Sequence, residues 1–300
     1  MIHILFNPLS ANGEGEQRAR VLTEKFPGAL FDDLTKLSSV QAFFDALTED
    51  DQLILAGGDG TINRLINSIE DREYPFPILY FPAGSGNDFF NDVKDNAKDG
   101  MILLNPYLHD LPTVTVNGET HRFLNGVGYG IDGYCCEVGD RMKEETPGKK
   151  INYAGIAIKG LLFHYKPANA KITVDGVTKK YRKVWLAPTM NGRFYGGGMD
   201  VAPAQDRLNA ERKISLVTLF GSGKIKTLVV FPSIFKGEHV KHGEMVNVLE
   251  GKHIEVEFDR PCALQIDGET ILGVTRYEAC AGAKNPANAR AAEPALAAAR

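Results

Sequence analysis

The sequence predicts a three-layer α/β domain followed by an antiparallel β domain of two packed layers. In the first third of the chain, short apolar runs alternate with segments whose apolar residues recur every three or four positions. That alternation is typical of strands and helices in a parallel sheet. From about residue 112 the apolar residues recur with a period of two, which is typical of antiparallel strands.

The first domain is expected to span residues 1–110. Its strands are predicted from apolar runs that are four or five residues long, at 2–6, 52–56 and 78–81. Its helices are predicted from apolar residues that share one face, at 15–26, 40–47 and 62–69. Because helices follow strands in turn, we expect them on both faces of the sheet.

The second domain is expected to span residues 111–280. Its strands follow the period of two and form two hairpins and three further strands, at 113–117 with 120–124, 171–175 with 177–185, 214–220, 253–258 and 263–266. Two stretches, 133–164 and 225–239, are predicted to be helical. The tail at 281–300 is rich in alanine and has few large apolar residues, so we expect a frayed extension.

Composition excludes several classes of protein. The 300 residues are 43% hydrophobic and 24% charged, values that are typical of globular proteins and not of disordered or collagen-like chains. A net charge of −4 argues against a nucleic-acid partner. Residues 1–110 hold 18 acids and 8 bases, whereas residues 141–183 hold 11 bases and 3 acids. The second segment therefore suits an anionic surface.

The chain is expected to be cytoplasmic. Its first residues contain no basic and apolar stretch of the kind that forms a signal peptide, and no apolar run approaches the roughly 18 residues that span a bilayer. The four cysteines include no CxxC pair. We expect them to be buried free thiols, which fits a reducing compartment.

Three loops directly follow predicted strands of the first domain, at residues 7–13, 57–61 and 82–88. Ligands of open parallel sheets bind beyond the carboxyl ends of the strands. If the three strands are neighbours, these loops converge on one site.

The residues of the loops suit a polyphosphate. Glycines let backbone N–H groups approach phosphate oxygens, and Thr61 is expected to open a helix whose N-terminus favours an anion. Asp59 and Asp88 would be well placed to hold Mg²⁺ against the phosphates. The alternative is that the glycines only form turns and that the two aspartates only cap helices.

Five segments, taken in order, resemble the catalytic domain of diacylglycerol kinases and related bacterial lipid kinases. They are Leu-Ile-Leu-Ala-Gly-Gly-Asp-Gly-Thr-Ile-Asn (53–63), Pro-Ala-Gly-Ser-Gly-Asn-Asp-Phe (82–89), the glycine-rich segment 125–132, the segment 191–204 and Ile-Asp-Gly-Glu (266–269). Sphingosine and NAD kinases belong to the same superfamily, and the first segment alone does not separate lipid kinases from NAD kinases.

The resemblance implies a Rossmann-like α/β domain, a β-sandwich domain, and an active site between them. It further implies transfer of the γ-phosphoryl group of ATP, with Mg²⁺, to a lipid hydroxyl, with diacylglycerol converted to phosphatidic acid as the default reaction. The positions that match nucleotide contacts are Asn7, Gly57, Gly58, Asp59, Gly60, Thr61, Asn63, Gly84, Ser85, Gly86 and Asn87. Asp59, Asp88 and Asp132 match residues that serve the metal, and Asp59 and Asp88 also count as catalytic. Glu269 matches the general base, although an ordinary turn residue is the alternative.

The chain departs from the family pattern at three places. Arg64 stands where the family usually has Glu, and Glu211-Arg212 stands where an Asp-Gly helps to hold a structural Mg²⁺. The basic residue that often follows the first strand is absent, and Arg18 or Arg20 can replace it. These departures leave open a catalytically weak nucleotide- or lipid-binding regulator. A kinase for another lipid alcohol, such as a sphingoid base or a polyprenol, is a separate alternative. An NAD kinase is less favoured, because the segment 191–204 resembles the lipid kinases.

A lipid substrate implies a membrane surface as partner. Residues 160–166, inside the basic segment 141–183, and residues 229–236 combine apolar with basic side chains. We expect them to dock on the inner membrane face, where basic residues are attracted to anionic lipid. The alternative is that they are core helices with solvated lysines. A homodimer is left open.

Overall fold

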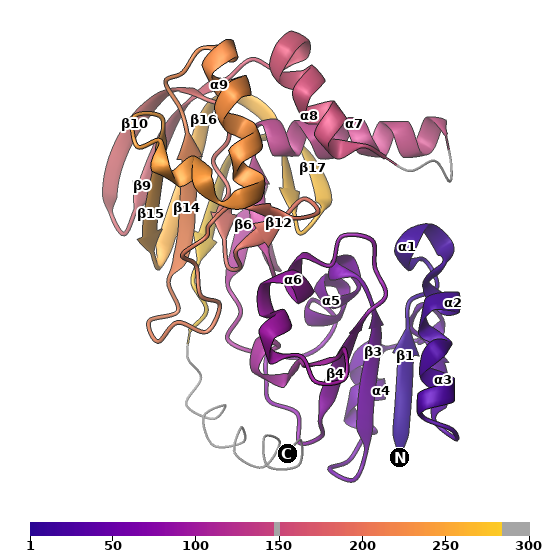
Figure 1. Cartoon of the computed structure of the whole chain (residues 1–300). Coiled ribbons are helices and arrows are strands. Elements are labelled where there is room, and N and C mark those ends of the chain that lie inside the picture. Colours follow the sequence, from indigo (N-terminus) through magenta and orange to yellow (C-terminus); the bar gives the residue numbers. More distant parts are fainter. Residues whose placement is uncertain (147–150, 284–300) are drawn as a thin grey trace. The chain divides into compact units, whose positions relative to one another are not determined.

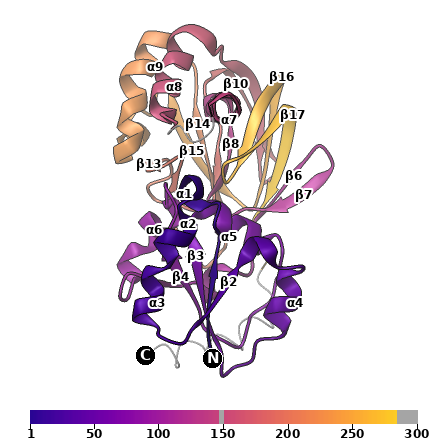
Figure 2. The same ribbon diagram turned by 90° about the vertical axis from the view of Figure 1, so that its right-hand side faces the viewer.

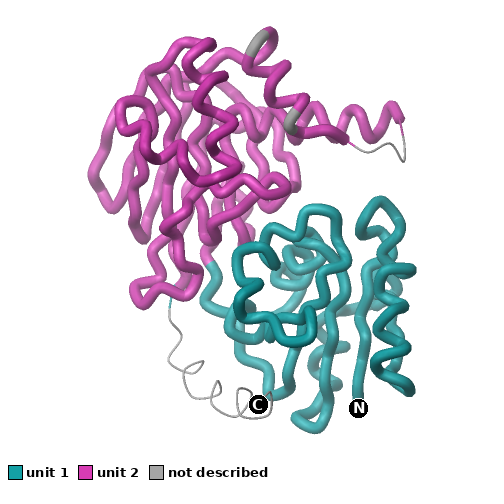
Figure 3. The backbone as a smooth tube through the Cα atoms, in the orientation of Figure 1, with its two compact units in different colours: residues 1–111, 283–300 teal, residues 112–282 magenta. Residues whose placement is uncertain are grey.

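The computed structural model describes residues 1–146 and 151–283 of the chain. They form two compact units, Met1–Leu111 and Pro112–Gly282, which are coloured separately in Figure 3. The tail expected at 281–300 lies, from residue 284 onward, outside the described residues.

Unit 1 is built on a five-stranded sheet with the order β2-β1-β3-β4-β5 (Figure 1). Its strands are β1 (Ile2–Phe6), β2 (Leu30–Asp33), β3 (Gln52–Gly57), β4 (Ile78–Pro82) and β5 (Ile102–Leu103). The first four run parallel, and β5 pairs antiparallel with β4. The strands β1, β3 and β4 are therefore direct neighbours, which is the condition for their following loops to meet.

Helices cover both faces of this sheet, as the three-layer prediction requires. In Figure 2, α2 and α3 lie on one side of the sheet and α4 lies on the other. The helical elements are α1 (Ser10–Gly13), α2 (Gly15–Ala19), α3 (Val21–Lys25), η1 (Leu34–Lys36), α4 (Val40–Asp45), α5 (Asp59–Ile66), α6 (Asp88–Val93), η2 (Lys94–Asn96) and η3 (Asn105–Tyr107). Ala19 and Leu22 pack against Ile4 and Ile54 of the sheet.

The helix boundaries in unit 1 differ from the prediction, and α4 and α5 end earlier than expected, at Asp45 and Ile66. The helix expected over 15–26 is divided at Arg20, whose ψ of −21° gives a tighter turn between α2 and α3. The helix expected over 62–69 begins earlier, at Asp59, because Gly58 is extended and its carbonyl accepts the N–H groups of Thr61 and Ile62. Thr61 thus lies within the first turn and does not open the helix.

Unit 2 contains a ten-stranded antiparallel sheet. Its strands are β6 (Thr113–Val116), β7 (Glu119–Arg122), β8 (Gly126–Tyr129), β9 (Ala168–Val174), β10 (Val177–Val184), β11 (Thr189–Met190), β14 (Ile214–Leu219), β15 (Val246–Gly251), β16 (His253–Ile266) and β17 (Glu269–Cys280). A separate ribbon pairs β12 (Phe194–Tyr195) with β13 (Met199–Asp200).

The long strand β16 divides this sheet into two layers. Its first half pairs with β9 and its second half with β8, and the register shifts between Glu257 and Leu264. Inward side chains from both parts join one core, in which Tyr129 and Phe258 stack with ring centroids 3.9 Å apart. The predicted β-sandwich is thus confirmed.

The helices of unit 2 pack on a second core around Trp185. They are α7 (Ile131–Glu145), α8 (Tyr153–Lys159), the π-helical η4 (Gly160–His164), α9 (Lys224–Val230), η5 (Phe231–Lys236) and η6 (Glu238–Lys241). Part of the stretch predicted as helical over 133–164, namely 147–150, lies outside the described residues. Within the described part of the chain, no helix is both long and apolar enough to cross a membrane.

All four cysteines are free, as predicted, but the expectation that they are buried holds only for Cys135. Cys136, Cys262 and Cys280 are half-buried, and Cys262 packs against the outside of the core that contains Tyr129. Burial raises the pKa of the Cys136 thiol to about 12.

Candidate active site

The loops that follow β1, β3 and β4 begin at the same edge of the unit 1 sheet. Phe6 pairs with Ala56, Ala56 pairs with Phe81, and Gly57 pairs with Pro82. The three strands therefore end level with one another. The first residues of the three loops therefore lie at one edge of the sheet. They are Asn7, Gly58 and Ala83.

The buried hydroxyl of Thr61 joins the first loop to the second. Asn7 Nδ2 donates to Thr61 Oγ1 at 3.0 Å, the Gly58 N–H donates to it at 3.4 Å, and Ser10 Oγ lies 3.0 Å from it. A hydroxyl has one donor and two acceptor positions, and these three partners use all of them. Thr61 thus fixes the loops, and its predicted contact with the nucleotide stays a prediction.

Glycines are required where the second and third loops meet. A Cβ on Gly84 would lie 2.4 Å from Gly58 Cα, and a Cβ on Gly57 would lie 2.4 Å from Thr61 Oγ1. Such distances are too short for any side chain. Gly60, by contrast, has open space on the side where a Cβ would stand. The first turn of α5 is therefore accessible from that side.

The Asp59 carboxylate joins the second loop to the third. Its Oδ2 accepts the backbone N–H of Asp88 at 2.9 Å, and its Oδ1 accepts that of Phe89 at 2.8 Å. Asp59 thus caps α6 from 29 residues earlier in the chain, and it does so as a carboxylate, which suits a helix N-terminus. Two of its four acceptor positions are used in this way. Asp88 itself is 6% exposed.

The third loop is held by hydrogen bonds with Tyr80 and Arg18. The Tyr80 hydroxyl lies 3.1 Å from the Gly57 carbonyl oxygen and 3.4 Å from Asn87 Oδ1, and Asn87 Nδ2 donates to the Gly84 carbonyl at 3.2 Å. Burial, together with the charges of Asp59 and Asp88, raises the pKa of Tyr80 well above its usual range.

Arg18 Nη1 donates to the Gly84 carbonyl at 2.9 Å. Of the two arginines named from the sequence, Arg18 is the one that reaches this site. Arg20 instead pairs with Glu16 and lies over the Phe31 ring.

The remaining predicted nucleotide positions are at the surface of this junction. Ser85 and Gly86 are exposed, and the Gly86 carbonyl accepts from Asn91 Nδ2 at 3.4 Å. Asn63 is half-buried and faces Asn67 one helical turn along α5. Arg64, the first departure from the family pattern, is exposed on α5 and does not contribute to the buried face of that helix.

Asp132 lies in unit 2, in the first turn of α7. It is 6% exposed, and its Oδ2 accepts the Tyr195 hydroxyl at 2.9 Å. Its Oδ1 has no hydrogen-bond partner among the described residues. Burial raises the pKa of Asp132 to about 6, although the Tyr195 hydrogen bond opposes that rise. A Cβ on Gly128 would lie 2.2 Å from Oδ2, so only glycine fits beside this carboxylate.

Glu269 is exposed as the first residue of β17, also in unit 2. It follows Asp267 and Gly268, which both have positive φ and form the turn between β16 and β17. The Asp267 carboxylate accepts the backbone N–H groups of Leu124, Asn125 and Gly126 at 2.5, 2.7 and 2.9 Å. Neither Asp267 nor Tyr195 was predicted to have a role, although both lie in the segments that resemble the lipid kinases.

The segment around Glu211-Arg212 is held by protein donors. Gln205 Nε2 lies within hydrogen-bonding distance of three carbonyl oxygens: those of Lys213 at 3.0 Å, Asp206 at 3.3 Å and Asn191 at 3.4 Å. Ser215 Oγ donates to Gln205 Oε1 at 2.5 Å. These carbonyl oxygens thus have a partner within the protein.

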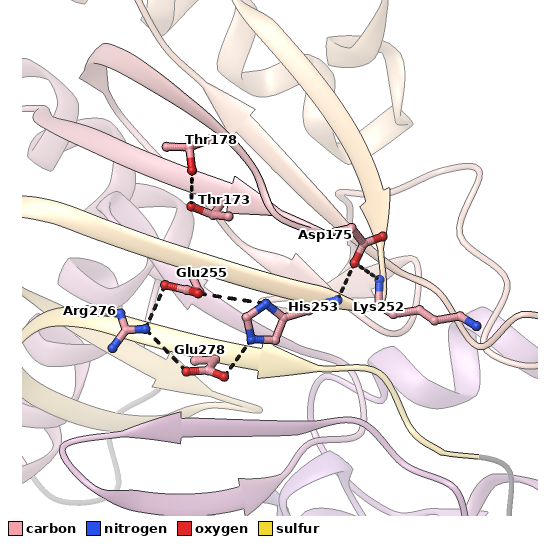
Figure 4. Close-up of polar contacts among 8 residues, drawn as sticks. All are labelled: Thr173, Asp175, Thr178, Lys252, His253, Glu255, Arg276 and Glu278. Carbon is pink, nitrogen blue, oxygen red and sulfur yellow. Dashed lines mark hydrogen bonds and ion pairs between the residues drawn. The ribbon is translucent and has the colours of Figure 1, made fainter.

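One group of potential metal ligands lies elsewhere in the described part of unit 2, on β16 and β17. It consists of His253, Glu278 and Cys280. His253 Nε2 lies 2.7 Å from Glu278 Oε1, and Arg276 bridges Glu278 and Glu255 (Figure 4). The carboxylates are thus already engaged in a cross-strand network of ion pairs, which contributes to the pairing of the two strands.

Comparison with known proteins identifies both units. The diacylglycerol kinase catalytic domain matches residues 1–107, and the YegS C-terminal NAD kinase beta sandwich-like domain matches residues 125–281, more than half of the chain. A diacylglycerol kinase of Mycobacterium tuberculosis (strain ATCC 25618 / H37Rv) is 26% identical over 214 residues, which cover 69% of this chain and 67% of that protein.

YtlR of Bacillus subtilis (strain 168), provisionally named a lipid kinase, is 25% identical over 244 residues, which cover 75% of this chain and 76% of YtlR. A crystal structure of a diacylglycerol kinase from Bacillus anthracis strain Sterne has the same fold, with a TM-score of 0.58 and 17% identity over 96% of this chain and 97% of that one. The family expected from the five segments is thus confirmed. The chain belongs to the family of lipid kinases that join a diacylglycerol kinase catalytic domain to a YegS-type C-terminal domain.

Proposed function

We propose that the chain transfers the γ-phosphoryl group of ATP, with Mg²⁺, to the free hydroxyl of diacylglycerol and so forms phosphatidic acid. The observation that carries this proposal is the junction of the three loops in unit 1, where Gly58 and Gly84 allow two backbones to meet. Backbone N–H groups in such a junction, together with the N-terminus of the eight-residue helix α5, favour a phosphate chain.

The side chains around this junction position the loops before the nucleotide arrives. Thr61 and Asp59 are engaged with neighbouring loops, so the glycine backbone is held in place by bonds that need not form during binding. Pre-organised donors reduce the free energy lost on ordering a site. We infer that ATP binds with its phosphates over Gly58, Gly60 and Gly84.

The aspartates fit a hard divalent cation. Mg²⁺ prefers carboxylate and water oxygens, and Asp59 and Asp88 place two carboxylates beside the glycine junction. Asp132 offers Oδ1, a buried oxygen that none of the described residues satisfies. We infer that Asp59, Asp88 and Asp132 serve the metal, directly or through water. When bound, Mg²⁺ would neutralise charge on the transferring phosphoryl group.

Glu269 is proposed as the general base. It would take the hydroxyl proton while the lipid oxygen bonds to the γ-phosphorus and ADP leaves with the electrons of the broken P–O bond. An exposed carboxylate at the start of a strand is accessible to a substrate. We further propose that the enzyme acts in the cytoplasm, at the inner membrane face, where its substrate lies.

The test is transfer of label from γ-³²P-ATP to diacylglycerol, sphingosine, a polyprenol and NAD, each with and without EDTA. The wild type should form labelled phosphatidic acid only when Mg²⁺ is available. Glu269→Gln should lower the rate by about 10²–10⁴-fold, the usual range for a general base.

Glu119→Gln is the matched control, because Glu119 is also exposed and also begins a strand after two residues of positive φ. It should leave the rate unchanged. Label on NAD alone, or on none of the acceptors, would refute the proposed function, and the second result would favour a regulator. An unchanged rate in Glu269→Gln would remove its role as the base.

A further inference from the structure

Large apolar side chains are exposed together on the helical part of unit 2. Ile225 and Val229 are four residues apart on α9 and are 82% and 74% exposed, and Phe163 on η4 is 71% exposed. Ile158 on α8 and Phe235 on η5 are each 44% exposed. Because a globular protein rarely exposes a contiguous apolar patch, such a group marks a surface that binds something.

These side chains lie on neighbouring elements. η4 contacts both α8 and α9, and Figures 1 and 2 place α8 and α9 side by side within unit 2. The opposite faces of the same elements pack into the core through Leu161, Val230 and Ile234. The alternative that the stretches 160–166 and 229–236 are core helices therefore holds for their inner face, and their outer face is exposed.

The segments that form this surface carry charges of a single sign. Residues 153–166, 177–184 and 224–236 contain nine lysines and arginines and no aspartate or glutamate. All nine are exposed, namely Lys159, Lys166, Lys179, Lys180, Arg182, Lys183, Lys224, Lys226 and Lys236. Lys226 pairs with Glu244 at 2.9 Å. A surface with an apolar centre and mainly basic flanks complements an anionic bilayer and would repel a basic partner.

The basic strand β10 is joined to the start of α9. The Gly221 N–H donates to the Arg182 carbonyl at 3.0 Å, three residues before α9 begins. An open hollow of about 480 Å³ lies there, lined by Lys179, Lys180, Tyr181, Arg182, Phe220 and Gly221. Its basic side chains suit the phosphate of a lipid headgroup. Because the hollow lies next to α9, one lipid headgroup could contact β10 while the apolar residues of α9 contact the neighbouring acyl chains.

We propose that the outer face of α8, η4 and α9, together with β10, is the surface with which this kinase docks on an anionic bilayer. This docking surface rests on the proposed function, since it gives the enzyme access to a lipid hydroxyl without extracting the acyl chains into water. Ile225, Val229 and Phe163 enter the interfacial region, and the residues of β10 contact headgroup phosphates.

A tryptophan placed on the docking surface tests the proposal directly. Trp185 is the single tryptophan of the chain and is 1% exposed, so it contributes a nearly constant background. Ile225→Trp should show a blue shift and quenching by brominated lipids with vesicles of phosphatidylcholine and phosphatidylglycerol at 7:3. Leu272→Trp is the control, because Leu272 is 61% exposed on β17 and lies outside the docking surface. Quenching that is equal at both positions, or absent at 225, would overturn the proposal.

Sedimentation with the same vesicles measures the contribution of each kind of contact. Ile225→Ser with Val229→Ser should lower the partition coefficient about tenfold or more. Lys179→Gln, Lys180→Gln and Arg182→Gln together should lower it by up to about a hundredfold at low salt, since each charge near the surface contributes about fivefold. Lys36→Gln, Lys94→Gln and Lys98→Gln remove the same charge from unit 1 and should have little effect. Pure phosphatidylcholine, or 0.5 M NaCl, should abolish the difference made by the three substitutions in β10.

A water-soluble short-chain diacylglycerol separates this proposal from the proposed function. The docking variants should phosphorylate it at the wild-type rate while losing activity on vesicles. Wild-type activity on the soluble substrate, with vesicle binding that the variants do not change, would overturn the docking surface alone. Vesicle binding as predicted, without phosphorylation of any lipid, would overturn the proposed function alone.

Discussion

Replacing Asp267 by Asn should destabilise unit 2 far more than the same change at Asp175. Both aspartates have left-handed backbones, with φ of 47° and 46°, and both precede a glycine in a hairpin turn. Asn tolerates this conformation, so neither variant introduces backbone strain. The two sites differ in the bonds that the carboxylate accepts.

At Asp267 both oxygens are needed. Oδ2 accepts the Leu124 N–H, while Oδ1 accepts those of Asn125 and Gly126. An amide would turn its NH₂ group toward the Leu124 N–H, so that hydrogen bond is lost. The bonds from Asn125 and Gly126 then go to a neutral oxygen instead of a charged one. A hydrogen bond to a charged group contributes about 1.5–3 kcal/mol and a neutral one about 1 kcal/mol. The expected loss is about 2–4 kcal/mol.

At Asp175 a single oxygen accepts both N–H groups, those of Lys252 and His253, each at 2.9 Å (Figure 4). Asn keeps that oxygen, and the site is exposed, so the expected loss is below about 1 kcal/mol. Urea unfolding followed by Trp185 fluorescence measures the difference, because the only tryptophan lies in the core of unit 2. Equal free energies of unfolding for the two variants would refute the reasoning.

Three further predictions concern the pH response, the loop junction and the structural metal. Burial lowers the pKa of His239, so near that pKa the folded state binds fewer protons than the unfolded state. The free energy of unfolding of unit 2 should therefore fall as the pH drops below about 6.5. His239→Gln should remove this contribution to the pH dependence of the unfolding free energy, measured with urea. Gly84→Ala places a Cβ 2.4 Å from Gly58 Cα, so it should weaken ATP binding at least tenfold in a fluorescent-nucleotide titration; unchanged binding would mean that the junction is not the nucleotide site. EDTA should leave the Trp185-monitored unfolding midpoint unchanged, since protein donors hold the segment 205–215; a lower midpoint would reveal a structural cation.

The sequence predicted the elements with strong local signals and missed those defined by distant partners. The strands β1, β3 and β4 are apolar runs that end at glycine, proline or asparagine, so both the strands and their loops could be located. The strand β2 has only two apolar residues and lies at the sheet edge, so no periodicity indicates it. The strand β17 contains Gly273 with φ of 72°, which interrupts the alternating pattern.

The same limit applies to the candidate site. Glycines and aspartates could be assigned to phosphate and metal, because those residue types carry the chemistry wherever the loops meet. The bonds of Asp267 could not be predicted, since its partners lie more than 140 residues earlier in the chain. Asp175-Gly176 and Asp267-Gly268 have the same sequence and the same turn conformation. Only the tertiary structure distinguishes the exposed turn from the one that anchors the segment leading to Asp132.

The two interpretations of Asp59 that the sequence left open are compatible. The carboxylate caps α6, which is the structural alternative, and each of its two oxygens accepts a backbone N–H group. The cap fixes the orientation of the carboxylate, and a fixed carboxylate is a better metal ligand than a mobile one, because little rotamer entropy is lost on binding. The same bonds also hold the third loop against the second, so the residue that would serve Mg²⁺ builds the glycine junction that would hold the phosphates. This coupling gives a physical reason for an aspartate, and not an asparagine or a serine, at the first turn of α5.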